Sequence, residues 1–125
     1  MAEGKRKFVN SLDNLDAERV ILMIYVIATV ELFAGKRNNY LEEFNKIVAA
    51  VRAEPGCLEY GPAEDVQTDI AIQEAVADDV ITIVERWTDT EALQTHLKTV
   101  HMLSYFEAVA AVVKKTGVRI LQPIP

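Results

Sequence analysis

The longest apolar run in the chain reads Val20-Ile21-Leu22-Met23-Ile24-Tyr25-Val26-Ile27-Ala28. Its β-branched and aromatic residues favour a central strand, and the pattern then alternates as far as Leu32. The run is too short for a membrane-spanning helix, which needs about 20 apolar residues. We therefore predict a buried strand in a protein that has no membrane partner.

A helix is predicted after this strand. Gly35 interrupts the strand pattern, and the turn Glu54-Pro55-Gly56 ends the helix, because proline disfavours helical geometry in the residue before it. Between these limits one apolar stripe recurs at helical spacing. Its members are Leu41, Phe44, Ile47, Val48 and Val51.

Two further strands are expected. The second runs from Cys57 to Tyr60 and is broken by Gly61-Pro62, and residues 63–79 show no clear period. The third is Val80 to Trp87. Alternation in this strand puts one carboxylate on an otherwise apolar face, formed by Ile81, Ile83, Glu85 and Trp87.

The C-terminal part predicts two helices and a last strand. Thr88-Asp89-Thr90-Glu91 resembles a capping box, so a short helix is expected through Leu97, and another begins near Thr99. The second helix is expected to end at Lys114 and Lys115, with Gly117 beyond it and a strand from Val118 to Leu121. Its expected apolar stripe is Leu103, Phe106, Ala110 and Val113.

The order strand, helix, strand, strand, helix, strand predicts an α+β domain of the ferredoxin-like split βαβ type over residues 20–125. Residues 1–19 are polar and are expected to form an N-terminal arm. Helices that cover one face leave the other face of the sheet open. Because that face is apolar here, we expect a homodimer.

Composition narrows the functional classes. Half of the 125 residues are hydrophobic, which suffices for one core, and the net charge of −6 argues against a nucleic-acid partner. The single cysteine cannot form an internal disulfide, and no Cys/His spacing indicates a metal site. Lys5-Arg6-Lys7 is followed by polar residues rather than by the apolar stretch of a signal peptide, so we expect a cytoplasmic protein.

Two histidines are the first candidates for chemistry. His96 and His101 are five residues apart, so their side chains converge only if the chain bends between them, as a new helix start at Thr99 suggests. Two histidines at such a bend can serve as acid and base near neutral pH. The alternative is that each is a buried hydrogen-bonding residue of the structure.

The third strand adds further candidates. Glu85 on an apolar face either pairs with a cation such as Arg119 or Arg37, or has a raised pKa that suits a general base. Trp87 on the same face can stack on a planar substrate or fill the core. Tyr60, at the end of the second strand, can orient a substrate oxygen or merely reach solvent.

Three blocks together resemble a known family. They are Glu54-Pro55-Gly56-Cys57-Leu58 with Tyr60, then Glu85-Arg86-Trp87, then Ala92-Leu93 with His96-Leu97 and His101. In their order and spacing, these blocks resemble sequences of the antibiotic biosynthesis monooxygenase superfamily, including its quinol monooxygenase-like members. The resemblance extends from Val20 to Pro123.

The resemblance implies a dimeric α+β barrel with a pocket between sheet and helices in each subunit. It also implies oxidation of a quinol, phenol or similar small aromatic substrate by molecular oxygen, without metal, flavin or haem. Trp87, His96, His101 and Tyr60 match pocket positions, and Glu85 matches the acid of the third strand. The segment of residues 61–79 is longer than the family's usual link between the second and third strands. The resemblance therefore does not identify the substrate.

Two other functions stay open from the sequence, since a fold does not determine a reaction. One is an isomerase of small molecules, which would need cationic groups in the pocket to hold an anionic substrate. The other is a non-catalytic ligand-binding or stress-associated protein.

Overall fold

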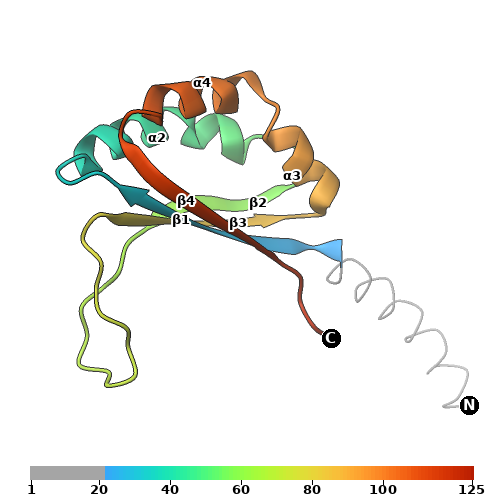
Figure 1. Ribbon diagram of the computed structural model, residues 1–125. Coiled ribbons are helices and arrows are strands. Elements are labelled where there is room, and N and C mark those ends of the chain that lie inside the picture. The colour runs from blue at the N-terminus through green and yellow to red at the C-terminus, as the bar shows by residue number, and fades with distance from the viewer. Residues whose placement is uncertain (1–21) are drawn as a thin grey trace, which may run out of the picture.

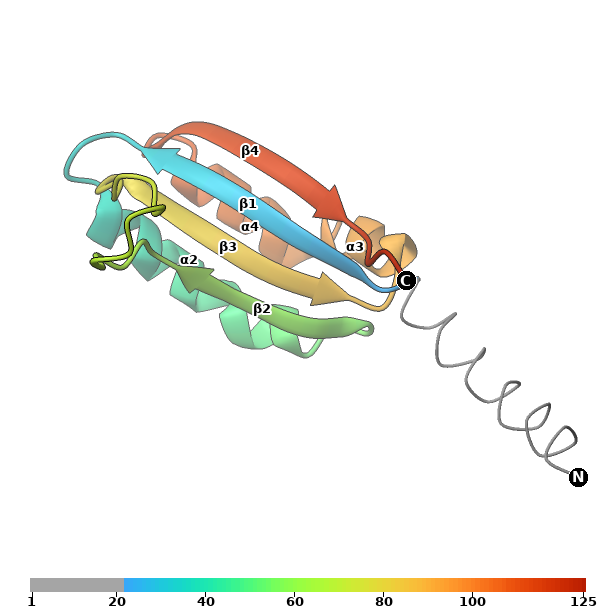
Figure 2. The ribbon, with the colours of Figure 1, turned by 90° about the horizontal axis from the view of Figure 1, so that it is seen from below.

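The computed structural model describes residues 22–125, and Figures 1 and 2 show a sheet with helices on one of its faces. The arm expected over residues 1–19 lies outside the described residues. The elements, in chain order, are β1 (Ile24–Leu32), α2 (Arg37–Arg52), β2 (Cys57–Ala63), β3 (Val80–Trp87), α3 (Thr90–His96), α4 (Val100–Val109) and β4 (Val113–Leu121).

The sheet has the strand order β2-β3-β1-β4, and each neighbouring pair is antiparallel. Strands β1 and β3 therefore lie in the middle, although α2 and β2 lie between them in the sequence. This order, with helices on one face, confirms the predicted ferredoxin-like α+β class.

Alternation along the two central strands explains how the core forms. Every second residue of β1 faces the helices and is at most 6% exposed, and the same holds for one face of β3. Helix α2 packs on this face through Phe44, Ile47 and Val51, which confirms the predicted stripe, and Tyr40 joins them. The core thus lies between the sheet and the helices.

The opposite face of the sheet carries Tyr25, Ile27 and Val84, which are half-buried although no described helix covers them. The segment between β2 and β3 extends on this side, away from the helices (Figure 1). This segment contains no helix or strand within residues 64–79.

The bounds of two strands differ from the sequence prediction. Strand β1 begins at Ile24 rather than Val20. Strand β2 continues through Gly61 and Pro62 to Ala63, so the predicted break was wrong. Proline is tolerated here because β2 is an edge strand that pairs only with β3. A missing N–H on its open side does not break a hydrogen bond between strands.

The C-terminal elements need larger corrections. Helix α3 begins one residue later than a cap at Thr88 predicts. Asp89 is the N-cap, and its side chain accepts a hydrogen bond from Ala92 N–H. Helix α4 ends at Val109, and Lys114, Lys115 and Gly117 all belong to β4. The buried residues of α4 are Met102, Tyr105 and Val109, not the predicted stripe.

None of the helices within the described part of the chain is long and apolar enough to cross a bilayer.

Candidate active site

The turn after α2 brings Glu54 beside α3. Gly56 has φ of +84°, a conformation that L side chains rarely adopt, and a Cβ there would lie 2.6 Å from Ala92 Cβ and 2.7 Å from Thr88 Oγ1. The carbonyl of Gly56 also accepts a hydrogen bond from Thr88 N–H at 2.9 Å. The backbone of the turn therefore packs directly on the start of α3, as only glycine permits.

The corner between α3 and α4 turns the two histidines toward each other. Thr99 caps α4 by accepting from Met102 N–H, and its hydroxyl donates to the carbonyl of His96 at 2.8 Å. The bend predicted at Thr99 is confirmed, and both imidazoles reach the same partner because of it.

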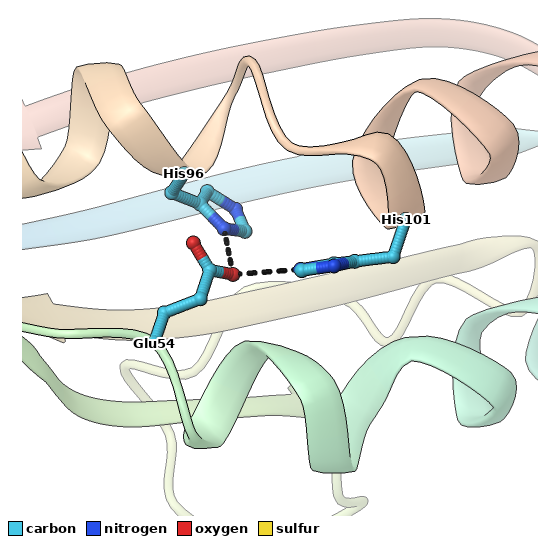
Figure 3. A group of neighbouring side chains, drawn as sticks. All are labelled: Glu54, His96 and His101. Atoms are coloured by element: carbon cyan, nitrogen blue, oxygen red, sulfur yellow. Dashed lines mark hydrogen bonds and ion pairs between the residues drawn. The ribbon is translucent and has the colours of Figure 1, made fainter.

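That partner is Glu54 (Figure 3). His96 Nδ1 and His101 Nε2 lie 2.8 Å and 2.9 Å from the same carboxylate oxygen, Oε2 of Glu54. The His96 side chain is 1% exposed, that of Glu54 9% and that of His101 28%. The three residues thus form a cluster that extends from the core to the surface.

The hydrogen bond to Glu54 determines how His96 can act. A carboxylate only accepts, so Nδ1 of His96 carries the hydrogen and Nε2 of the neutral ring keeps a lone pair. Burial lowers the pKa of His96, and the neighbouring Glu54 partly opposes this effect. The ring is therefore a neutral base, and its hydrogen bond to Glu54 fixes the tautomer.

A cavity of about 340 Å³ lies between the sheet and the two C-terminal helices. Most of its lining is apolar and comes from β1, β3, α4 and β4. The lining residues with polar side-chain groups are Tyr60, Glu85, His96, Tyr105 and Thr116. Neither lysine nor arginine lines it within the described chain.

Glu85 borders this cavity and forms no ion pair with a cation among residues 22–125. Its Oε1 accepts a hydrogen bond from Trp87 Nε1 at 2.9 Å, and burial raises its pKa to about 7 although that hydrogen bond acts in the opposite direction. Of the two cations suggested from the sequence, Arg37 binds Glu64 and the carbonyl of Asp78, and no ion pair or side-chain hydrogen bond joins Arg119 to Glu85.

The two aromatic candidates are both buried. Trp87 is fully buried, its ring centre lies 4.6 Å from that of His96, and it does not line the described cavity. Tyr60 does line the cavity, stacks on Phe44 and meets the His96 ring edge-on at 5.5 Å. Burial raises the pKa of Tyr60, so its hydroxyl remains protonated and can donate.

Sequence reasoning missed two residues of this region. Glu54 was noted in a helix-ending turn and in the first block of the family resemblance but not as a candidate site residue, although it contacts both histidines. Tyr105 lines the cavity and shares a hydrogen bond between hydroxyls with Tyr40. The only signal for Glu54 was its place in the first block of the family resemblance.

His101 lies outside the cavity lining and reaches the cavity only through Glu54 and His96. The three side chains of this cluster each offer one atom suited to binding a metal ion, and these atoms lie within 4.8 Å of one another. The region thus contains a cavity bordered by Glu85 and His96 and an adjoining cluster of possible metal ligands.

Comparison with known proteins shows the family of the chain. Residues 23–108 match the family model described as antibiotic biosynthesis monooxygenase. The probable quinol monooxygenase YgiN of Escherichia coli K12 is 39% identical over 103 residues, which cover 81% of this chain and 98% of that protein. The protein of the same name from Shigella flexneri gives the same values.

Solved structures share the fold. A crystal structure from Pseudomonas aeruginosa has a TM-score of 0.70 at 24% identity, and covers 85% of this chain and 98% of its own. A conserved protein from Methanosarcina mazei has a TM-score of 0.72 at 19% identity, with coverage of 86% and 99%.

Proposed function

The chain belongs to the antibiotic biosynthesis monooxygenase family, and we propose that it oxidises a small aromatic quinol or phenol with molecular oxygen, without a bound cofactor. The observation that carries this proposal is the apolar cavity, which is bordered by a neutral imidazole and by a carboxyl group whose pKa is about 7. Similarity to a probable quinol monooxygenase supports this choice of substrate class.

The cavity lining supports an uncharged aromatic substrate. Its apolar walls favour a planar hydrocarbon ring, and the tyrosine and threonine hydroxyls can bind ring oxygens. A phosphorylated substrate would instead need a cation, which the described lining lacks. This argues against the isomerase alternative.

The first step is removal of a substrate proton by His96. Its Nε2 has a lone pair because Nδ1 donates to Glu54, as in other sites where a carboxylate orients a histidine base. The resulting quinol anion is electron-rich, and a dry cavity leaves it poorly solvated. Such an anion can reduce dioxygen directly, which is why no cofactor is required.

In the second step the anion gives one electron to dioxygen, and the two radicals join to form a C–O bond at a ring carbon. His96 then returns the proton that it removed to the outer oxygen of the resulting peroxide. The ring carbon loses its hydrogen as a proton, which Glu85 accepts, while the O–O bond breaks, a carbonyl forms and hydroxide is released. The hydroxide takes up the proton from Glu85 and leaves as water. One oxygen atom stays in the product and the other becomes water.

Oxygen uptake with a panel of reduced quinones and phenols tests this function in buffer treated with a chelator. We expect uptake that is faster than the spontaneous oxidation of at least one substrate and that stops in a His96→Ala variant. As a matched control, Leu103→Ala changes an exposed residue of α4 outside the cavity and should retain activity. Ligand binding without uptake would favour the non-catalytic alternative.

We also propose that two subunits join through the open face of the sheet to form an α+β barrel. The support is the half-buried Tyr25, Ile27 and Val84 on a face that no described helix covers. The cytoplasmic location stays a prediction from the sequence.

A further inference from the structure

We propose that Glu54, His96 and His101 bind a divalent transition-metal ion of the zinc type, at the end of His96 that faces Glu54. His96 Nδ1, His101 Nε2 and a Glu54 oxygen lie within 4.8 Å of one another (Figure 3). Neither Glu54 nor His101 lines the cavity. The metal site is therefore distinct from the substrate cavity, and the two share only the His96 ring.

The spacing of the donor atoms fits one ion. Two ligands that each lie about 2.1 Å from a metal, at angles between those of octahedral and tetrahedral sites, are roughly 3.0 to 3.4 Å apart. The two nitrogen–oxygen distances of the cluster are 2.8 Å and 2.9 Å, and all three donor atoms lie within 4.8 Å of one another, so the oxygen has to move outward and the two nitrogens toward each other when the ion binds. Two imidazoles and one carboxylate are also a donor set that zinc uses, with water in the remaining position.

The ligands come from segments that the fold holds in place. Glu54 precedes the turn that packs on α3 through Gly56, and His96 is held by the hydroxyl of Thr99 on its carbonyl. His101 is the most exposed of the three and gives an ion access from solvent. A metal here would connect the end of α2 to the corner between α3 and α4.

Metal binding would change the chemistry of His96. Without metal, Nδ1 carries the hydrogen and Nε2 is a free base. Coordination requires the lone pair at Nδ1, so the hydrogen of the neutral ring moves to Nε2. This consequence rests on the proposed function: the base that removes the substrate proton becomes a donor, and the metal acts as an inhibitor.

The chain contains only two histidines, so imidazole ligands can be assigned without ambiguity. The experiment uses the full chain without a polyhistidine tag, freed of metal by a chelator. Zn²⁺ binding is measured by calorimetry, and Co²⁺ binding by its visible absorption. We expect one ion per subunit, with a dissociation constant in the micromolar range or below.

The variants Glu54→Gln and His101→Ala should weaken binding by at least about 100-fold, since even the loss of an outer partner of a metal ligand costs 10–100-fold. Glu107→Gln, which removes an exposed carboxylate of α4, is the matched control and should bind as the parent does. Melting curves without metal check that each variant is folded. His96→Ala is avoided because that side chain is buried.

Absence of Zn²⁺ and Co²⁺ binding, or binding that the Glu54 and His101 variants retain, overturns the proposal and leaves a hydrogen-bonded cluster. A Co²⁺ spectrum with a thiolate charge-transfer band overturns it too, because the ligand would then be Cys57. Metal binding is measured without substrate, so a failure to bind metal can be distinguished from a failure of the proposed oxygenase function. Where both hold, Zn²⁺ should inhibit oxygen uptake at the concentrations that fill the site.

Discussion

At the scale of single residues, His96 joins two environments. One edge of its ring binds Glu54 and the ring also borders the cavity. If Nε2 removes a substrate proton, His96→Ala should lower kcat by roughly 10² to 10⁴, the usual effect of losing a general base. A loss confined to KM would indicate positioning only.

The same variant also tests the structural alternative. If His96 only satisfies Glu54, its loss should lower the melting temperature, because Glu54 would keep fewer hydrogen-bond partners. Near-normal turnover per folded subunit in a destabilised variant would exclude the catalytic role. Activity and melting temperature therefore have to be measured on one preparation.

Glu85 gives a prediction about pH. Its pKa rises from 4.5 to about 7 on folding, so the folded chain keeps a proton that the unfolded chain has lost. The stability from this group is fully present below pH 4.5 and is lost as pH rises through 7. The loss is at most about 3 kcal/mol, at 1.36 kcal/mol per pKa unit.

Glu85→Gln removes this dependence. The free energy of unfolding of the variant, relative to that of the parent, should increase as the pH rises from 4.5 to 8. Urea unfolding at several pH values measures this difference. If the ionised carboxylate also accepts a proton in the reaction, turnover of the parent should rise through pH 7, and the variant should lack this rise. A parallel pH dependence of stability in both proteins would contradict the assignment.

At the scale of elements, the turn at Gly56 connects α2 to α3. Gly56→Ala combines a positive φ with contacts of 2.6 Å and 2.7 Å, whereas Gly35→Ala meets nothing within 4 Å and adds only the strain of φ +76°. We expect about 1 kcal/mol of lost stability at Gly35 and several times that at Gly56. Equal losses in chemical denaturation would show that the turn does not pack tightly on α3.

The elements also show where sequence reasoning fails. The order of strands and helices along the chain and the apolar stripe of α2 could be predicted from alternation and helical spacing. In α4, by contrast, the buried residues Met102, Tyr105 and Val109 and the exposed residues Leu103 and Phe106 are all apolar, so periodicity does not show which face is buried. Lys114 and Lys115 looked like the end of a helix, but they lie on the edge strand β4, where lysine is also common.

The candidate site was only partly readable for a similar reason. The bend at Thr99 and the buried carboxylate of Glu85 follow from local patterns. The contact between Glu54 and His96 joins residues 42 positions apart in the sequence, and a periodic pattern gives no information about contacts over such a separation. The pairing of Trp87 with Glu85 is local, yet the alternation indicated only a shared face and not a hydrogen bond.

At the scale of the whole molecule, the open face of the sheet predicts a homodimer at micromolar concentration. Ile27→Lys places a charge on that face and should shift sedimentation toward the monomer. Leu103→Lys, on an exposed position of α4, is the control and should leave the dimer intact. A monomeric parent protein would contradict the predicted assembly.

The proposed reaction transfers one oxygen atom to an aromatic substrate bound in the cavity. Mass spectrometry of the product formed under ¹⁸O₂ tests this transfer in chelator-treated buffer, with a quinol that the oxygen-uptake screen has identified. We expect a product that contains one ¹⁸O atom, labelled water, and no such product with His96→Ala. A quinone without label, formed together with hydrogen peroxide, would contradict it, because the protein would then remove electrons without inserting oxygen.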